Sequence, residues 1–284
     1  MSDESDVARK HYEGGAKQQD LVTRVEQLLE ALGEGPITSE QLAGFDQFHS
    51  GGLETTADFI DLLGLTPEMK VLDAGSGLGG PSRYTAEKYG CHVTGVDLTE
   101  SFVAVAKLLA ARTGMDNLLD YQVGNLLNLD LADEQFDVVY TQHVVMNIAN
   151  RAQVYREIRR VLKPGGKFGF FDVLAAEDSP ALSFPVPWAE TSEDSVLLTD
   201  MQTRESLADA GLTVETWQDV TQELIEWFNR FQKPSAQSAN QGPTLKLVMG
   251  DRFGKMAENF ARNLRENRIR LVMAVSVRDE SPRI

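Results

Sequence analysis

Val71-Leu72-Asp73-Ala74-Gly75-Ser76-Gly77-Leu78-Gly79-Gly80 is the stretch that decides the fold of this 284-residue chain. A short apolar strand runs directly into a loop rich in glycine. Glycines allow the backbone to turn sharply, and they allow a ligand to approach without a Cβ in the way. Helix-compatible sequence follows as far as Tyr89. This order of strand, glycine loop and helix is typical of nucleotide-binding α/β folds.

Strands and helices alternate along the chain after the glycine loop. Helices of roughly ten to fifteen residues between short apolar strands favour a parallel sheet with helices on both faces. The strands are expected at 71–74, 91–97, 121–123, 136–140 and 167–172, and the helices between them at 80–89, 100–113 and 152–162. Two further strands are expected at 213–219 and 270–278. The sequence therefore predicts an α/β fold.

Additional helices are expected on either side of this core. Residues 1–66 are predicted to form an N-terminal helical lid, because apolar side chains fall on one face of a helix that Gly33 ends: Leu21, Val25, Leu28, Leu29 and Leu32. The roughly 50 residues between the last two strands are too many for a simple connection. Residues 221–265 are therefore expected to form a helical cap inserted before the last strand. The core is assigned to residues 67–220 and 266–284.

The composition argues against several classes of protein. The net charge is −16, so nucleic acid and anionic membrane surfaces are poor partners. The longest clean apolar run, Leu271 to Val275, falls far short of the roughly 18 residues of a membrane span. The single cysteine excludes an intrachain disulfide, and four scattered histidines predict no metal site. The acidic N-terminus lacks the pattern of a signal peptide, which favours a cytoplasmic protein.

Two classes of cofactor fit the glycine loop. Asp97 ends the second strand, where a carboxylate can accept hydrogen bonds from both hydroxyls of a ribose. The glycines also satisfy the spacing of the NAD(P)-binding motif, through Gly80. Asp73, two residues before the loop, favours a cofactor with an ammonium group, such as S-adenosylmethionine, over one with a pyrophosphate. A structural interpretation of Asp73, as a cap for the amides of the loop, stays open.

The chain resembles the class I S-adenosylmethionine-dependent methyltransferases in five motifs that occur in the order of that family. They are Val71–Gly80, Gly95–Leu98, Gly124–Leu127, Phe136–Tyr140 and Arg160–Lys167, the last expected as the turn before the fifth strand. The resemblance covers about residues 45–175. It implies a Rossmann-like, seven-stranded, mostly parallel sheet that ends in an antiparallel pair of strands, with S-adenosyl-L-methionine as the cofactor.

The same resemblance implies a set of cofactor-binding residues. The methionine end is expected over the glycine loop, the ribose on Asp97 and the adenine against Leu98. Asn125 stands where the family more often has an aspartate, and its side-chain carbonyl is expected to meet the adenine amine. The complete set is Ser50, Asp73, Gly75, Ser76, Gly77, Asp97, Leu98, Asn125, Leu126 and Gln142.

A nearer resemblance is to the sarcosine/dimethylglycine and phosphoethanolamine methyltransferases, which share the lead-in Ser50-Gly51-Gly52-Leu53-Glu54-Thr55-Thr56. It implies that this segment closes the cofactor from solvent, with His49 and Ser50 at the pocket. The phosphoethanolamine enzymes have an aspartate just after the fourth strand, and a histidine four residues later, as a catalytic pair. This chain has His143 and Asn147 at those positions, which argues against phosphoethanolamine as the acceptor.

His143 is the candidate general base. It is expected at the carboxyl end of a central strand, where open α/β sheets bind ligands. Its imidazole can deprotonate an ammonium, a hydroxyl or an acidic carbon before attack on the methyl group. Asn147, one helical turn later, is expected to orient the acceptor or the imidazole. A purely structural role for His143 is the alternative.

The acceptor is expected among residues of the lid, the fourth-strand turn and the cap. The candidates are His49, Met146, Trp188, Trp227 and Phe231. Aromatic side chains can hold a methylated ammonium by cation–π attraction, or they form only the apolar core of the cap.

These patterns favour a cytoplasmic methyltransferase that acts on a small molecule, as a monomer or homodimer and without a metal ion. An amine nitrogen is the leading acceptor. Carbon or oxygen methylation of an apolar natural-product metabolite is the alternative reaction. A regulator that binds S-adenosylmethionine without turnover is the alternative from another class.

Overall fold

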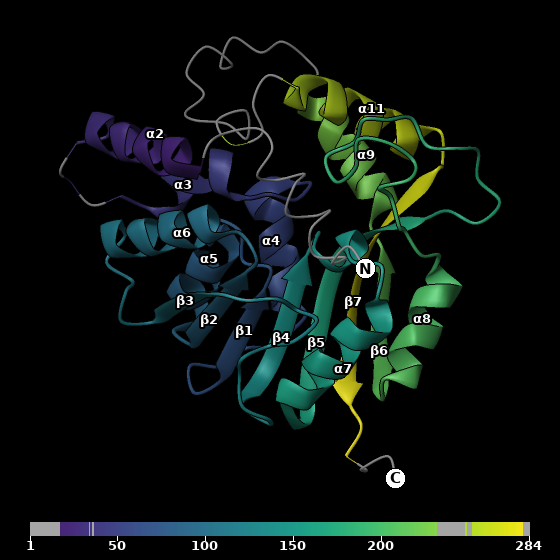
Figure 1. Cartoon of the computed structure of the whole chain (residues 1–284), viewed down its shortest axis with the longest axis horizontal. Helices are drawn as coiled ribbons and strands as arrows, with labels where there is room; N and C mark the ends of the chain where they lie inside the picture. The colour runs from purple at the N-terminus through teal and green to yellow at the C-terminus, as the bar shows by residue number, and fades with distance from the viewer. Residues whose placement is uncertain (1–17, 34, 36, 232–247, 249–251, 281–284) are drawn as a thin grey trace.

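The fold is built on one seven-stranded sheet (Figure 1). The computed structural model describes residues 18–33, 35, 37–231, 248 and 252–280. The strands are β1 (Lys70–Ala74), β2 (His92–Asp97), β3 (Leu119–Val123), β4 (Phe136–Gln142), β5 (Leu162–Ala175), β6 (Leu212–Asp219) and β7 (Ile269–Arg278). Their order is β3-β2-β1-β4-β5-β7-β6, and only β7 runs antiparallel to its neighbours. The predicted seven-stranded, mostly parallel sheet is confirmed.

The strand order places a crevice at the middle of the sheet. The chain lays down β2 and β3 on one side of β1, and then crosses to β4 on the other side. In open parallel sheets, ligands bind outside the carboxyl ends of the strands at such a reversal of order. The residues that end these strands are Ala74, Asp97 and Gln142, so the glycine loop, the acid after β2 and the turn after β4 meet at one edge.

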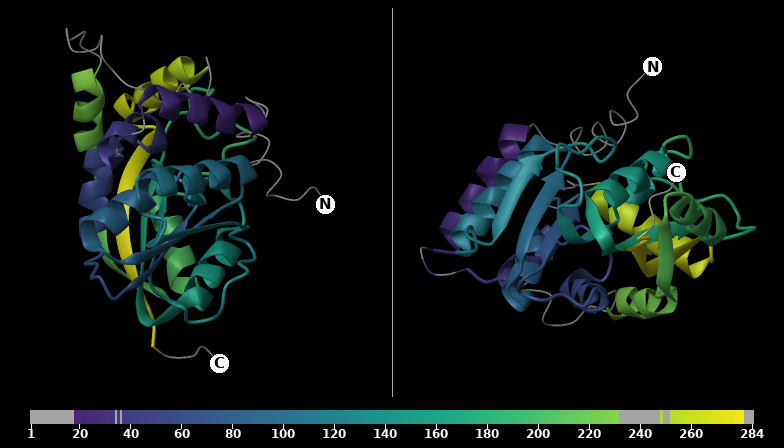
Figure 2. Two further views of the ribbon diagram at one scale, coloured as in Figure 1. Left: turned by 90° about the vertical axis from the view of Figure 1, so that its left-hand side faces the viewer. Right: turned by 90° about the horizontal axis from the view of Figure 1, so that it is seen from below.

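Helices cover both faces of the sheet, as expected (Figure 2). On one face α5 (Gly80–Tyr89) and α6 (Glu100–Arg112) bury their apolar sides against β1, β2 and β3, and Phe59 of α4 (Gly52–Asp61) packs against β4 and β5. On the other face α7 (Arg151–Val161) and α8 (Asp200–Asp209) pack against β4, β5 and β6. A single 3-10 turn, η1 (Val145–Asn147), follows β4. Within the described ranges, no helix has the length and apolarity needed to cross a membrane.

The N-terminal helices α2 (Gln18–Ala31) and α3 (Ser39–Asp46) lie beside the glycine loop. A capping box between Thr38 and Gln41 starts α3, which satisfies two amides of its first turn. The apolar face of α2 packs on α6 in a separate core that also contains Leu78 of the glycine loop. The predicted lid helix that ends near Gly33 is therefore present. The lid boundary at residue 66 stays a prediction.

A buried ion pair joins α3 to α5. The Nη2 of Arg83 donates to Oδ2 of Asp46 at 2.6 Å, and both side chains are at most 1% exposed. The Nη1 of the same guanidinium donates to the carbonyl of Leu78. Gly80 makes this approach possible, because a Cβ there would lie 2.5 Å from the carbonyl oxygen of Asp46. The segment after α3 is thus held against the first turn of α5.

The cap consists of α9 (Thr221–Phe231) and α11 (Phe253–Arg265), which pack on each other and on β7. Figure 1 shows them at the same end of the sheet as α2 and α3. Two buried asparagines of α11 hold the segment that follows β5. Asn259 donates to the carbonyl of Pro185, and Asn263 both donates to and accepts from the backbone of Ser183. The boundaries of the cap, 221–265, stay a prediction.

The fifth strand is longer than the sequence predicts. Residues 160–167 are expected as a turn, but β5 already begins at Leu162 and runs for 14 residues. Leu162 pairs with Phe136 of β4, and the register then shifts before Val138 pairs with Lys167. The glycines at 165 and 166 accommodate this irregularity, because a Cβ on Gly166 would meet the carbonyl of Lys163 at 2.8 Å. The expectation of a turn at 160–167 is therefore wrong for most of that segment.

Removal of the buried carboxylate should destabilise the protein strongly. In Asp46→Ala, the Arg83 cation loses its partner inside the core, and such a loss costs about 3–5 kcal/mol in the free energy of unfolding. Urea denaturation of the wild type and the variant measures the difference. Glu258→Ala, which removes an exposed partner of Lys255, is the control and should change stability little. Equal effects of the two substitutions would contradict a structural role for the buried pair.

Candidate functional site

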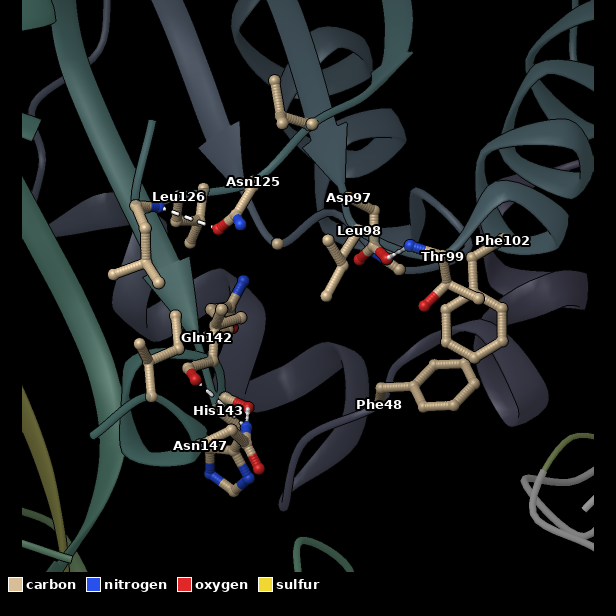
Figure 3. Close-up of a pocket in the computed structure, with 17 residues that line it drawn as sticks. Phe48, Asp97, Leu98, Thr99, Phe102, Asn125, Leu126, Gln142, His143 and Asn147 are labelled. Atoms are coloured by element: carbon tan, nitrogen blue, oxygen red, sulfur yellow. Dashed lines mark hydrogen bonds between the residues drawn. The ribbon is translucent and has the colours of Figure 1, made fainter. Parts of the chain in front are cut away.

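A cavity of about 890 Å³, open to solvent, lies at the carboxyl ends of β1, β2 and β4. Figure 3 shows Asp97, Leu98 and Thr99 on one side of it, and Gln142, His143 and Asn147 on the other. Asn125 and Leu126 close a third side, and the rings of Phe48 and Phe102 lie next to each other. The cavity is where the strand order predicts a ligand site.

Asp97 is held rigidly at this cavity. One carboxylate oxygen accepts from the backbone N–H of Gly77, and the other accepts from that of Thr99, both at 2.8 Å. Burial raises the pKa of Asp97, and these amide hydrogen bonds oppose that rise. Because a carboxylate can accept about four hydrogen bonds, Asp97 keeps acceptor positions for two hydroxyl groups of a ligand.

The glycine loop lets the backbone approach the cavity. Gly75 and Gly77 adopt φ values of 95° and 52°, a region that side chains disfavour. A Cβ on Gly75 would lie 2.3 Å from a methyl group of Val144. The first glycine is therefore needed both for the turn and for the packing of the loop on the residues after β4.

Gln142, the last residue of β4, lines the cavity with an unused amide. Both polar atoms of this buried side chain lack a hydrogen-bond partner among the described residues. Buried polar groups in proteins are almost always paired. The amide of Gln142 is therefore expected to bind polar atoms of a ligand.

His143 follows directly, in an unusual backbone conformation. Its φ is +55°, which costs energy for a residue with a side chain and is found most often at functional sites. The conformation is held from both sides: the backbone N–H of His143 donates to the carbonyl of Phe171, and Nδ2 of Asn147 donates to the carbonyls of His143 and Val144. Asn147 therefore positions the backbone of His143, and among the described residues its side chain makes no hydrogen bond to the imidazole.

A second cavity, of about 520 Å³, adjoins the first. It is lined by Phe48, His49, Ser50, His143, Pro187, Trp188, Trp227, Phe228, Phe253, Ala257 and Phe260. Its aromatic rings pack edge to face, with ring centroids 5.7 Å apart for Trp188–Phe260 and 5.5 Å apart for Phe228–Phe260. Phe48 and His143 line both cavities. The two residues therefore mark the passage between a more polar chamber and an aromatic one.

His49 uses both ring nitrogens within the protein. Nδ1 lies 3.0 Å from the carbonyl oxygen of Ser50. Nε2 lies 2.8 Å from Oγ1 of Thr56 and 2.9 Å from the side-chain oxygen Oε1 of Gln47. Burial lowers the pKa of His49 to about 4. His49 is thus a neutral wall of the second cavity.

His143 keeps a ring nitrogen for other partners. Its Nε2 lies 3.3 Å from Oγ of Ser50, and no described residue bonds its Nδ1. Burial, reinforced by the neighbouring His49, lowers the pKa of His143 well below its usual value of 6.5. The imidazole is therefore neutral at pH 7.

The structure brings most of the predicted residues together. Gly75, Gly77, Asp97, Leu98, Asn125, Leu126, Gln142, His143 and Asn147 line the first cavity, and His49, Ser50, Trp188 and Trp227 line the second. Ser50 is therefore placed with the acceptor candidates and not with the cofactor candidates. The side-chain carbonyl oxygen of Asn125 already accepts from the backbone N–H of Leu127, which leaves this oxygen one further acceptor position.

Three predicted residues lie elsewhere, and the side chain of a fourth is not among those that the structure describes. Asp73 is buried behind the glycine loop, where it accepts from Ser82 and where burial raises its pKa to about 7; a structural role fits this position. Ser76 is buried and does not line the cavity. Met146 packs in the core. The side chain of Phe231 lies outside the described residues. Their roles as ligands stay predictions.

Several residues of the site carry no sequence signal. Phe48 and Phe102 come from the lid and from α6, and Gln47 and Thr56 reach His49 from either side of the glycine pair. Gln47, Phe48 and Phe102 belong to none of the motifs, whereas Thr56 ends the lead-in that begins at Ser50. Only the position of Phe48 beside His49 in the chain gives a hint.

Comparisons with known proteins agree with this geometry. Residues 72–170 match the family described as "Methyltransferase domain". The chain is 31% identical over 197 residues to phosphoethanolamine N-methyltransferase 1 of Arabidopsis thaliana, covering 69% of this chain and 39% of the plant protein. It is 32% identical over 174 residues to a sarcosine/dimethylglycine N-methyltransferase of Halorhodospira halochloris, covering 60% of each. The chain thus spans less than two thirds of these relatives.

A solved structure shares the fold along nearly the whole chain. It is that of geranyl diphosphate C-methyltransferase from Streptomyces coelicolor in complex with Mg²⁺, a substrate analogue and S-adenosyl-L-homocysteine. The TM-score is 0.68, with 18% identity, and the match covers 98% of this chain and 99% of the other. At this identity the likeness concerns the fold alone.

The stability contributed by His49 should fall as the pH decreases from 6.5 to 4. In this pH range His49 becomes protonated in the unfolded chain but stays neutral in the native state, because burial lowers its pKa in the native state to about 4. His49→Gln removes the titrating group. The free energy of unfolding of the wild type minus that of the variant should therefore decrease with falling pH, by at most about 1.4 kcal/mol per unit. A constant difference would show that native His49 takes up the proton.

Proposed function

We propose that the protein transfers a methyl group from S-adenosyl-L-methionine to a small molecule, because residues 72–170 match the family described as "Methyltransferase domain". The observation that carries the proposal is the pair of adjoining cavities that share Phe48 and His143. Two ligands bound one in each cavity would meet at these residues. An activity of this kind requires such a meeting point, because the nucleophile must face the methyl carbon in line with the bond that breaks.

The residues of the first cavity fit the cofactor. Asp97 offers acceptor positions for the ribose hydroxyls, and Leu98, Phe102 and Leu126 offer apolar surface for the adenine. The unpartnered amide of Gln142 and the backbone of Gly75, which lines this cavity, suit the polar methionine end. When bound, the cofactor supplies an electrophilic methyl group on a sulfonium. NAD(P) is less well supported, because the family match concerns methyltransferases.

The second cavity supports an amine nitrogen as the acceptor atom. Burial among apolar walls penalises an ammonium and so lowers its pKa, which presents the nitrogen in its neutral, nucleophilic form. The aromatic rings of Trp188 and Trp227 can then hold the methylated product by cation–π attraction. His143 orients the nitrogen by a hydrogen bond and accepts a proton where one must leave. The two N-methyltransferase relatives support the same choice.

Methylation of carbon or oxygen on an apolar metabolite is the second candidate. It is favoured by the lining of the second cavity, in which only His49, Ser50 and His143 are polar. Product analysis separates the two candidates. Incubation with ¹³C-methyl-labelled cofactor and a metabolite mixture gives one labelled methyl signal, whose NMR shift shows whether nitrogen, oxygen or carbon carries it. The cytoplasmic location and the monomeric or homodimeric state stay predictions.

Asp97→Ala should weaken binding of S-adenosylhomocysteine by at least about tenfold. The substitution removes the acceptor for the ribose hydroxyls, and each hydrogen bond to a charged group contributes roughly 1.5–3 kcal/mol. Isothermal titration calorimetry measures the affinity. The exposed Asp116, replaced by alanine, is the matched control and should bind like the wild type. Unchanged affinity of Asp97→Ala would contradict the assignment of this cavity to the cofactor.

His143→Ala should leave the affinity for S-adenosylhomocysteine nearly intact and lower the rate of methyl transfer by roughly 10²–10⁴-fold. His92→Ala, at an exposed histidine beside Asp120, is the control. Because burial keeps the pKa of His143 well below 6.5, the wild-type rate should not fall as the pH decreases through 6.5, and should fall only at lower pH. A folded His143→Ala protein with the wild-type rate would refute this role.

A further inference from the structure

Ser50 joins the lid to the one histidine that lines both cavities. Its Oγ lies 3.3 Å from Nε2 of His143, across 93 residues of chain. Ser50 is 8% exposed and lines the second cavity. It immediately precedes Gly51, the residue that starts α4 with a φ of 85°. The hydroxyl is therefore placed by the lid, and not by the strand that carries His143.

The other contacts of His143 involve its backbone and the face of its ring, and not the ring nitrogens. Phe171 accepts the backbone N–H of His143 and packs its ring 4.7 Å away, centroid to centroid. Asn147 bonds only the backbone carbonyls. The ring of His49 lies 6.1 Å away, edge on. Among the residues that the structure describes, Ser50 alone bonds a nitrogen of this imidazole.

A neutral imidazole carries one proton, and the nitrogen without it is the acceptor. His143 is neutral at pH 7 because burial lowers its pKa well below 6.5. Which nitrogen holds the proton therefore decides whether the free Nδ1 donates a hydrogen bond to the second ligand or takes a proton from it. The hydroxyl of Ser50 can either donate to Nε2 or accept from it, and only the tautomer with the proton on Nε2 leaves Nδ1 able to take a proton.

We propose that Ser50 is a positioning residue: its Oγ accepts the Nε2–H of His143, which leaves the Nδ1 lone pair free to take a proton from the acceptor molecule. The inference rests on the proposed methyl transfer. In that reaction the nucleophile forms its bond to the methyl carbon, and the electron pair of the broken carbon–sulfur bond stays on sulfur. The proton of the nucleophile moves to Nδ1, and the resulting imidazolium donates from Nε2 to Ser50.

Nitrogen NMR of the histidine-labelled full chain tests the proposal without any acceptor. His143→Gln identifies the signals of His143 by their loss. At pH 7, with S-adenosylhomocysteine bound, Nε2 of His143 should give the signal of a protonated ring nitrogen, and Nδ1 that of an unprotonated one. The reverse assignment, with the proton on Nδ1, would overturn the proposal.

Variants separate the role of Ser50 from general effects on the lid. Ser50→Ala should turn the single tautomer of His143 into a mixture, and Ser50→Thr, which keeps a hydroxyl, should restore it. Thr56→Val removes the hydroxyl beside Nε2 of His49 and should change the signals of His49 alone. A tautomer of His143 that is unchanged in Ser50→Ala overturns the proposal. Methyl transfer from labelled cofactor is measured separately and tests only the proposed function.

Discussion

The buried ion pair between Arg83 and Asp46 fastens the lid to the core, and both cavities depend on it. Asp46 ends α3, and the next four residues place Phe48, His49 and Ser50 over the crevice. A charge pair with almost no solvent exposure tolerates little displacement, because either partner alone would be a desolvated charge. The short segment after α3 is thus a fixed wall between the two chambers, although it comes from outside the sheet.

The two histidines at this wall, His49 and His143, are both buried but differ in their hydrogen bonds. Both are neutral because burial disfavours the imidazolium, but their nitrogens are engaged differently. His49 is bonded at both nitrogens by lid residues, while His143 is bonded at one. Hydrogen-bond saturation makes His49 part of the wall. The second ring nitrogen of His143, which no described residue bonds, is available to a ligand.

Sequence reasoning predicts the parts of this protein that follow local rules. Alternating strands and helices, the glycine loop and the acid at Asp97 were all predictable, because hydrophobic period and turn chemistry determine them. The partner of Ser50 was not predictable, since it lies 93 residues away and depends on how the lid docks. The same holds for the neutral state of His143, which comes from desolvation by residues distant in the chain. The start of β5 at Leu162 was not predictable, because the residues that follow, Lys163-Pro164-Gly165-Gly166, have the composition of a turn.

Helix α11 builds much of the aromatic chamber, and it does so independently of the glycine loop. Asn259 and Asn263 hydrogen-bond the backbone of Pro185 and Ser183, shortly before Pro187 and Trp188, which line the chamber. Three further residues of α11 also line it: Phe253, Ala257 and Phe260. One helix therefore carries part of the lining and also fixes the neighbouring strand-exit segment. Sequence changes on α11 can reshape this chamber without disturbing the glycine loop or Asp97. Such a division allows the shape of the aromatic chamber to change while the cavity at Asp97 stays constant.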